Sequence, residues 1–221
     1  MLFRSPALNQ NIIVAYQRQG KVDDAFAERF TAAMDSRGLH LAQSLAKACA
    51  PELASSARLL DVGGGSGVYS CVLCAFQPNL RAAILEKPPV DRLAARAVSK
   101  RGLSARIETS ALNMFESPWP KDCDLHLISN VLHDWDAPDV KRLLTKSHDA
   151  LPAGGHLMIH DMHLNDAKDG PFAVAAYSAL LMQITEGRIY STREIREWSA
   201  DIGFDWVDFR TTSAEIGRAH V

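Results

Sequence analysis

The chain of 221 residues is 47% hydrophobic and 23% charged, with a formal net charge of -2. This composition is typical of a globular protein with one sizeable core and provides no basic surface for nucleic acid or an anionic membrane. No apolar run reaches the length of a membrane span, and the first residues, MLFRSPALNQ, lack the apolar segment of a signal peptide. We therefore expect a cytoplasmic protein without nucleic-acid or membrane partners.

The first predicted elements are helical. Residues 22–50 place apolar side chains at helical spacing, and a second amphipathic stretch continues to residue 50. We interpret residues 1–50 as a helical lead and residues 51–214 as a catalytic domain. The apolar face of the lead carries Phe26, Phe30, Ala33 and Met34.

From residue 58 onward, short apolar strands alternate with helices. The predicted strands are 58–62, 81–86, 104–109, 123–129, 156–161 and 205–212, and the predicted helices are 67–77, 89–102, 138–150, 171–185 and 192–202. This alternation predicts an α/β fold, with a Rossmann-like parallel sheet and helices on both faces. Ligands of such sheets bind at the carboxyl ends of the strands, near the switch in strand order.

Two of the four cysteines, Cys71 and Cys74, form a C-x-x-C pair. A redox or metal site would need an electropositive surface or a second pair of ligands. The pair lies in VYSCVLCAF, an apolar stretch with helical spacing, so we expect two reduced thiols packed in the core.

A glycine loop, residues 60–67 (LDVGGGSG), follows the first strand. Its glycines let a ligand approach the backbone, and the next helix directs its free N–H groups toward that ligand. A nicotinamide fingerprint would need glycine at Val68, so a nicotinamide dehydrogenase is disfavoured. Glu86 ends the next strand, 19 residues after Gly67, where a carboxylate can accept both hydroxyls of a ribose.

Six segments follow one another in the order seen in a known family. They are LLDVGGGSG, ILEKPPV, NMFESP, ISNVLHDWDAPDV, LPAGGHLMIHDMHL and EGRIYSTREIREWSADIGF. From about Phe30 to about Thr212, the chain resembles the catalytic domain of small-molecule O-methyltransferases of the caffeate, hydroxyindole and bacterial polyketide type. The resemblance implies a class I methyltransferase fold and S-adenosylmethionine as cofactor.

The resemblance also implies which residues hold the cofactor. Glu86 would bind the ribose, and Asn113 stands where the family usually has Asp beside the adenine; its amide can still hydrogen-bond an adenine edge. The residues expected to contact the cofactor are Asp61, Gly63, Gly65, Glu86, Asn113, Met114 and Phe115.

By the same resemblance, His133 occupies the position of the general base. Asp161 matches a family carboxylate, usually Glu, that orients this base. A second family carboxylate would fall at Ile189, so base orientation must rest on Asp161 alone. The alternative is that His133 caps a helix or packs in the core, where Asp134 and Asp136 already supply acids to the first turn.

The chemistry expected of His133 favours an acidic hydroxyl. A phenol has a pKa near 10 and histidine one of about 6.5, so proton transfer costs on the order of 5 kcal/mol before any help from the site. For an aliphatic alcohol the cost rises to on the order of 12 kcal/mol. We therefore expect a small aromatic molecule with a phenolic hydroxyl as substrate, bound in line with the methyl group.

The walls of the substrate pocket are predicted from apolar side chains at helical spacing, with ordinary core packing as the alternative. We expect no metal, since the chemistry needs none, although His156, His160 and His163 crowd one strand. The predicted pocket residues are Phe30, Met34, Leu180 and Ile184.

Both ends of the chain depart from the family pattern. Family members carry a helical dimerisation domain of about a hundred residues ahead of this region, and with it we expect a homodimer. The last seven residues, 215–221 (EIGRAHV), resemble the translation of a sequencing-adapter oligonucleotide. We expect this tail to be non-native and the last strand of the sheet to be missing; resequencing the locus tests this.

Other functions stay open at this stage. One is a relative that uses the cofactor for another reaction on aromatic polyketides, such as decarboxylation or hydroxylation, as the missing acid at Ile189 allows. Methyl transfer to nitrogen is another. A non-catalytic cofactor-binding module is the alternative from a different class.

Overall fold

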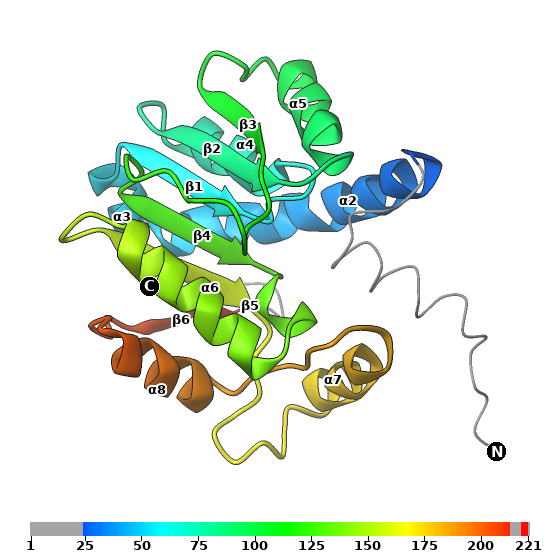
Figure 1. Cartoon of the computed structure of the whole chain (residues 1–221), viewed down its shortest axis with the longest axis vertical. Coiled ribbons are helices and arrows are strands. Elements are labelled where there is room, and N and C mark those ends of the chain that lie inside the picture. The colour runs from blue at the N-terminus through cyan, green and yellow to red at the C-terminus, as the bar shows by residue number, and fades with distance from the viewer. Residues whose placement is uncertain (1–23, 213–217, 221) are drawn as a thin grey trace.

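The structure is a computed structural model that describes residues 24–212 and 218–220, the latter and Phe30 without their side chains. Seven strands form one sheet in the order β3-β2-β1-β4-β5-β7-β6 (Figure 1). The strands β1 to β5 are parallel, whereas β7 runs antiparallel to both of its neighbours. Their bounds are β1 (Arg58–Val62), β2 (Arg81–Glu86), β3 (Ile107–Ala111), β4 (Leu125–Ser129), β5 (His156–Asp161), β6 (Phe209–Thr211) and β7 (Arg218–His220).

Helices cover both faces of this sheet, as the alternation of elements predicts (Figure 1). One face packs against α2, α4 and α5, and the other against α6 and α8. The helices are α2 (Asp24–Ala48), α3 (Ala50–Ser55), α4 (Val68–Phe76), α5 (Val90–Lys100), the short 3-10 helix η1 (Leu132–Asp134), α6 (Ala137–Ala150), α7 (Phe172–Ile184) and α8 (Thr192–Ile202).

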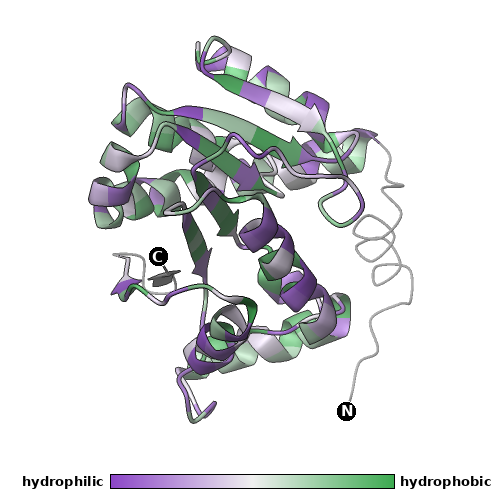
Figure 2. Cartoon of the chain, turned by 60° about the vertical axis from the view of Figure 1, so that its left-hand side comes forward, coloured by the Kyte–Doolittle hydropathy of each residue, from purple (hydrophilic) through white to green (hydrophobic). Residues whose placement is uncertain are grey.

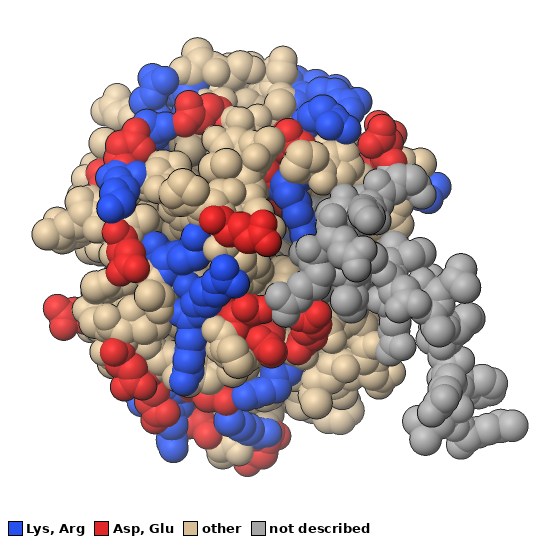
Figure 3. Space-filling model, in the orientation of Figure 1, with Lys and Arg blue, Asp and Glu red and all other residues tan. Residues whose placement is uncertain are grey.

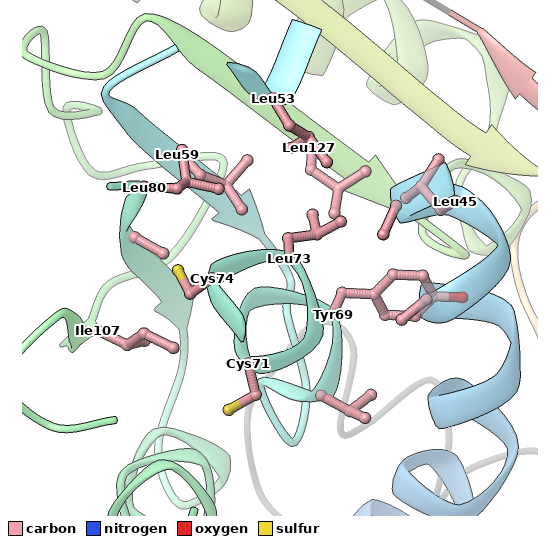
Figure 4. Packing of buried hydrophobic residues seen from close by; sticks show 14 of the residues in the cluster. Leu45, Leu53, Leu59, Tyr69, Cys71, Leu73, Cys74, Leu80, Ile107 and Leu127 are labelled. Atoms are coloured by element: carbon pink, nitrogen blue, oxygen red, sulfur yellow. The ribbon is translucent and has the colours of Figure 1, made fainter. Parts of the chain in front are cut away.

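The core lies in the two layers between sheet and helices. Hydrophobic residues dominate the central strands, while polar residues lie on the outer faces of α5, α6 and α8 (Figure 2). Leucines from β1, α4 and β4 meet in one layer (Figure 4). Cys71 and Cys74 project from α4 into the same cluster, and both are buried free thiols, as predicted. Burial raises the pKa of Cys74 to about 12, so this thiol is kept protonated.

The strand order reverses between β1 and β4. From β1 the chain moves outward through β2 and β3, then returns to the other side of β1 to form β4. At such a switch point the connections leave in opposite directions, which opens a crevice at the carboxyl ends of the two strands. The glycine loop follows β1 and η1 follows β4, so both reach this crevice.

Two strand predictions differ from the structure. The strand expected at 104–109 begins only at Ile107, because Arg106 N–H donates to the carbonyl of Leu103 in a turn. The strand expected at 205–212 is reduced to β6, and Trp206 and Val207 before it are exposed.

The expectation that the sheet lacks its last strand is corrected by β7. Arg218–His220 pair with β5 from Asp161 to Ile159, and with β6 on the other side. Backbone groups make these pairs, so a segment of any side-chain composition can occupy the position. Residues 215–217 and 221 of the tail lie outside the described residues, and its origin stays a prediction.

The charged surface agrees with the nearly balanced composition. On the face shown in Figure 3, basic side chains lie beside acidic ones across the described residues. Among the described helices, none combines the length and apolarity that crossing a membrane requires.

Candidate active site

A cavity of about 270 Å³ lies at the carboxyl ends of β1, β2 and β4, with α2 and α7 forming further walls. It is mainly apolar, with a few convergent polar groups, which is typical of a small-molecule site. Ten of the predicted site residues line it: Met34, Asp61, Gly63, Gly65, Glu86, Asn113, Met114, Phe115, His133 and Ile184.

The glycine loop forms one end of the cavity. Gly63 and Gly65 have φ values of 66° and 56°, in the left-handed region that favours glycine. A Cβ at Gly65 would meet no atom within 4 Å, so this backbone is open to a ligand. The N–H of Gly65 also donates to Oε2 of Glu86 at 3.2 Å, which joins the loop to the acid at the end of β2.

Glu86 is a buried carboxylate, and its hydrogen-bond donors among the described residues are backbone N–H groups. Oε1 accepts from the backbone N–H of Lys87 at 2.9 Å. Burial raises the pKa of Glu86, and the hydrogen bonds from Lys87 and Gly65 oppose that rise. This acid can exchange weak backbone partners for the hydroxyls of a ribose.

Asp61 is buried beneath the glycine loop. Its carboxylate accepts from the hydroxyl of Ser70 on α4 at 2.7 Å. Burial raises the pKa of Asp61 to about 6, although the hydrogen bond from Ser70 opposes this. A Cβ at Gly64 would lie 2.8 Å from this carboxylate, so Asp61 requires glycine above it and thereby sets the loop.

Asn113 and the two residues after it form the wall on the β2 side. The Oδ1 of Asn113 accepts from the N–H of Phe115 at 2.9 Å, and Met114 lies between them. This is the local turn that Asp also forms, so the amide preserves the backbone that places both apolar side chains at the cavity. Apolar walls of this kind suit a purine ring.

His133, which lines the cavity, forms a buried pair with Asp161. The Nδ1 of His133 lies 2.6 Å from Oδ1 of Asp161, and both side chains are almost fully buried. Burial lowers the pKa of His133, but the charge and hydrogen bond of Asp161 outweigh it and hold the pKa well above its ordinary range. Burial alone would raise the pKa of Asp161, but the charge and hydrogen bond of His133 outweigh burial and lower the pKa of Asp161.

The segment 185–190 holds the turn that carries His133. A Cβ at Gly187 would overlap the carbonyl oxygen of His133 and lie 2.5 Å from the nitrogen of Trp135. The hydroxyl of Tyr190 donates to the carbonyl of Trp135 at 2.6 Å. Ile189 is fully buried, and its N–H donates to Ser178 at 3.1 Å. This segment supports the turn around His133 through backbone contacts, and Asp161 is the carboxylate hydrogen-bonded to the His133 ring.

The apolar wall differs in part from the prediction. Met34 and Ile184 line the cavity, whereas Leu180 is 48% exposed and points away from it, so that prediction is wrong. The side chain of Phe30 lies outside the described part of the chain. The lining residues that sequence reasoning missed include Arg37, Trp135, Tyr177 and Leu181.

His160 in β5 and His163 just after it contact different partners. Nδ1 of His160 lies 3.3 Å from the hydroxyl of Ser129, and Nδ1 of His163 lies 3.2 Å from the carbonyl of Tyr190. Among the described residues, no three side chains of His, Cys, Asp or Glu lie close enough together to hold a metal ion.

Comparison with known proteins decides the family. A model of the O-methyltransferase domain matches residues 12–205. The chain belongs to this O-methyltransferase family. S-adenosylmethionine is its cofactor, and the residues present fit it: an open glycine loop, a buried acid able to accept ribose hydroxyls, and an apolar wall suited to an adenine ring.

Several bacterial relatives are similar in sequence. The chain is 35% identical over 156 residues to the 3-hydroxy-5-methyl-1-naphthoate 3-O-methyltransferase of Streptomyces sahachiroi, covering 71% of this chain and 45% of that protein. It is 36% identical over 166 residues to the mitomycin biosynthesis 6-O-methyltransferase of Streptomyces lavendulae, covering 75% and 46%. The chain thus spans about half the length of the curated relatives it matches.

A solved O-methyltransferase family 2 protein from Planctomyces limnophilus, in complex with apigenin, has 36% identity and a TM-score of 0.83. The match covers 92% of this chain and 62% of that one. Family relatives also include an L-tyrosine C(3)-methyltransferase and the N,N-dimethyltransferase OxyT. Family membership therefore gives the donor, whereas the acceptor atom differs among relatives.

Proposed function

We propose that this protein transfers a methyl group from S-adenosylmethionine to the phenolic hydroxyl of a small aromatic molecule, with His133 as the general base. One observation carries the proposal: His133, hydrogen-bonded to Asp161, lines the same cavity as the glycine loop and Glu86. The donor site and a proton acceptor are thus held within one apolar enclosure.

The residues divide the chemistry between them. When bound, S-adenosylmethionine supplies a methyl group attached to a sulfonium, and the sulfur leaves as the neutral thioether of S-adenosylhomocysteine. Nε2 of His133 takes the proton of the acceptor hydroxyl, while its Nδ1 keeps the hydrogen bond to Asp161. Asp161 fixes the ring and stabilises the imidazolium that forms.

The electrostatics of the pair favour a phenol. Because Asp161 holds the pKa of His133 above its ordinary range, the difference from a phenol, of about 3.5 units for an unperturbed histidine, becomes smaller. An aliphatic alcohol remains far less acidic. The apolar side chains of Met34, Tyr177 and Leu181 form a wall suited to an aromatic ring.

Methylation of nitrogen is the second candidate, since OxyT is an N,N-dimethyltransferase and 28% identical. An amine that attacks as the free base needs no proton removed before transfer, so loss of His133 would have a smaller effect on its rate than on that of a phenol.

Transfer of a labelled methyl group tests the proposal. The wild type and His133→Ala are incubated with methyl-labelled S-adenosylmethionine and matched panels of phenols and aromatic amines. We expect label on phenol oxygen with the wild type and a loss of about 100-fold or more with the variant. Label on amines alone, or none on any acceptor by protein that binds the cofactor, would contradict it.

We also propose that the protein acts as a homodimer. On α7, whose inner face lines the cavity, Phe172 is 86% and Met182 63% exposed. Exposed apolar side chains of this size are typical of an interaction surface. Light scattering of the protein tests this, and a monomeric mass at micromolar concentration would contradict it.

A further inference from the structure

Two cations of α6, Lys146 and Arg142, reach the turn 113–117, which follows β3. Nζ of Lys146 donates to the carbonyls of Phe115 and Ser117, at 3.1 and 2.8 Å. Nη2 of Arg142 donates to the same carbonyl of Phe115 at 3.0 Å. Burial lowers the pKa of Lys146, and the charge of Arg142 lowers it further. Like charges four positions apart destabilise a helix, so this pair is not explained by the stability of α6 itself.

Aromatic rings beside the turn hold the two cations in place. Nζ of Lys146 lies 5.9 Å from the centre of the Trp119 ring, and the guanidinium of Arg142 lies 5.4 Å from that of the Phe115 ring. Nε1 of Trp119 donates in turn to the carbonyl of Met114 at 2.8 Å. The carbonyls of three residues of the turn are thus bound by side chains from outside it.

The turn also makes hydrogen bonds within itself. The N–H of Ser117 donates to the carbonyl of Asn113 at 2.9 Å, and the N–H of Asn113 donates to Oγ of Ser117 at 3.2 Å. Met114 and Phe115 of this turn line the cavity, whereas the two cations are not among the described residues that line it. Lys146 and Arg142 therefore contact the wall from outside the cavity.

We propose that Lys146 and Arg142 are positioning residues for cofactor binding, which rests on the proposed function. They hold the turn 113–117 in the conformation in which Met114 and Phe115 form the wall for the adenine ring. A wall that is already ordered loses less conformational entropy when the ligand binds. The two cations thus raise the affinity for the cofactor without contacting it.

Calorimetry with S-adenosylhomocysteine measures the Kd for the wild type and four variants. Lys146→Met removes the donor but keeps a long apolar side chain, and Lys146→Arg keeps both the charge and the donors. Arg142→Met removes the second donor to Phe115. Lys141→Met is the matched control, because it removes the same charge from the same helix at a residue whose Nζ lies over the Trp198 ring, 5.2 Å from its centre.

Hydrogen exchange of the proteins without ligand measures the order of the turn itself. The N–H of Phe115, which donates to Asn113, should exchange about tenfold faster in Lys146→Met than in the wild type and be unchanged in Lys141→Met. Faster exchange throughout the sheet with an unchanged Kd would show that Lys146 contributes only to overall stability, and it would overturn the inference.

We expect a Kd about tenfold higher in Lys146→Met, about threefold higher in Arg142→Met, and close to the wild type in Lys146→Arg and Lys141→Met. The KM for S-adenosylmethionine should rise with the Kd, while kcat on a phenol at saturating cofactor stays within about twofold. A wild-type Kd in Lys146→Met, or an equal loss in Lys141→Met, overturns the inference.

Arg142→Met, which leaves the contacts of Lys146 in place, decides the inference if Lys146→Met does not fold. A Kd and an exchange rate of Phe115 equal to those of the wild type would then overturn it. Wild-type protein that does not bind S-adenosylhomocysteine contradicts the proposed function as well, whereas wild-type binding with unchanged variants contradicts this inference alone.

Discussion

Nδ1 of His133 lies 2.6 Å from Oδ1 of Asp161, across 28 positions of the sequence. His133 lies in η1, which follows β4, and Asp161 ends β5; β4 and β5 are neighbouring parallel strands. Oδ1 of Asp161 also accepts from the N–H of Met162 at 2.8 Å, so the local backbone fixes the carboxylate. With Nδ1 occupied, Nε2 is the nitrogen left for the acceptor, since Oδ1 of Asp134, at 3.8 Å, is beyond hydrogen-bonding distance of it.

Replacing the base tests its part in the rate. His133→Gln should lower kcat by about 10² to 10⁴, the usual contribution of a general base. The affinity for S-adenosylhomocysteine should stay within about twofold, because the substitution leaves the cofactor contacts expected at the loop 63–65 and at Glu86 unchanged. An unchanged kcat on a phenol would show that His133 is structural.

The Asp161→Asn variant should change the pH profile. Transfer needs the unprotonated imidazole, so the rate of the wild type should rise with pH up to a value above the ordinary pKa of histidine, about 6.5. Without the charge of Asp161, this rise should move to lower pH while the maximal rate falls by about 100-fold or more. A rise at the same pH in both proteins would contradict this coupling.

The same pair should make stability depend on pH. The raised pKa of His133 adds stability that is complete below about pH 6.5 and is lost as the pH rises through the pKa of the folded state. The lowered pKa of Asp161 adds stability that is complete above about pH 3.9 and is lost as the pH falls through the pKa of the folded state. Asp161→Asn should therefore cost most between these values, about 3 kcal/mol. Urea unfolding across pH measures this, and a cost independent of pH would be evidence against the ion pair.

Glu86→Gln should weaken cofactor binding. A carboxylate accepts from two ribose hydroxyls, whereas an amide offers one acceptor and one donor group, so we expect a Kd for S-adenosylhomocysteine about tenfold higher or more. Glu197→Gln, on the exposed side of α8, is the matched control and should bind as the wild type does. Equal affinities of all three proteins would remove Glu86 from the cofactor site.

Gly187→Ala should shift the position of His133 without changing the His133 side chain itself. The added methyl overlaps the carbonyl of His133, so η1 must shift, and we expect kcat to fall by about tenfold and unfolding to cost about 1–3 kcal/mol less. At Gly170 the nearest atom to an added Cβ is 3.8 Å away, so Gly170→Ala is the control. Wild-type kcat in Gly187→Ala would show that this contact does not position His133.

The cofactor end of the site is readable from the sequence because it depends on local patterns. Buried parallel strands are continuous apolar runs that end at turns, and β1, β2 and β5 begin and end at the predicted residues. The glycine loop and Glu86 follow directly from the ends of β1 and β2. Their meeting in one cavity is then a consequence of parallel order.

The acceptor end depends on contacts that periodicity does not reveal. Helix α7 contains no charged residue, so its apolar pattern does not distinguish the inner face from the outer one. Tyr177, Leu181 and Ile184 face the cavity, and Leu180, one residue and about 100° away, faces outward. Arg37 was missed for a similar reason, because one arginine in a helix is indistinguishable from an ordinary solvated cation until its neighbours are known.

The most direct test of the account is single-turnover methyl transfer to a phenol, measured for the wild type and His133→Gln at saturating S-adenosylmethionine from about pH 6 to about pH 10. The account predicts a wild-type rate that rises through a pKa above about 6.5 and a variant that binds the cofactor but is slower by about 100-fold or more and lacks that rise. Equal rates with the same pH dependence in both proteins would contradict it.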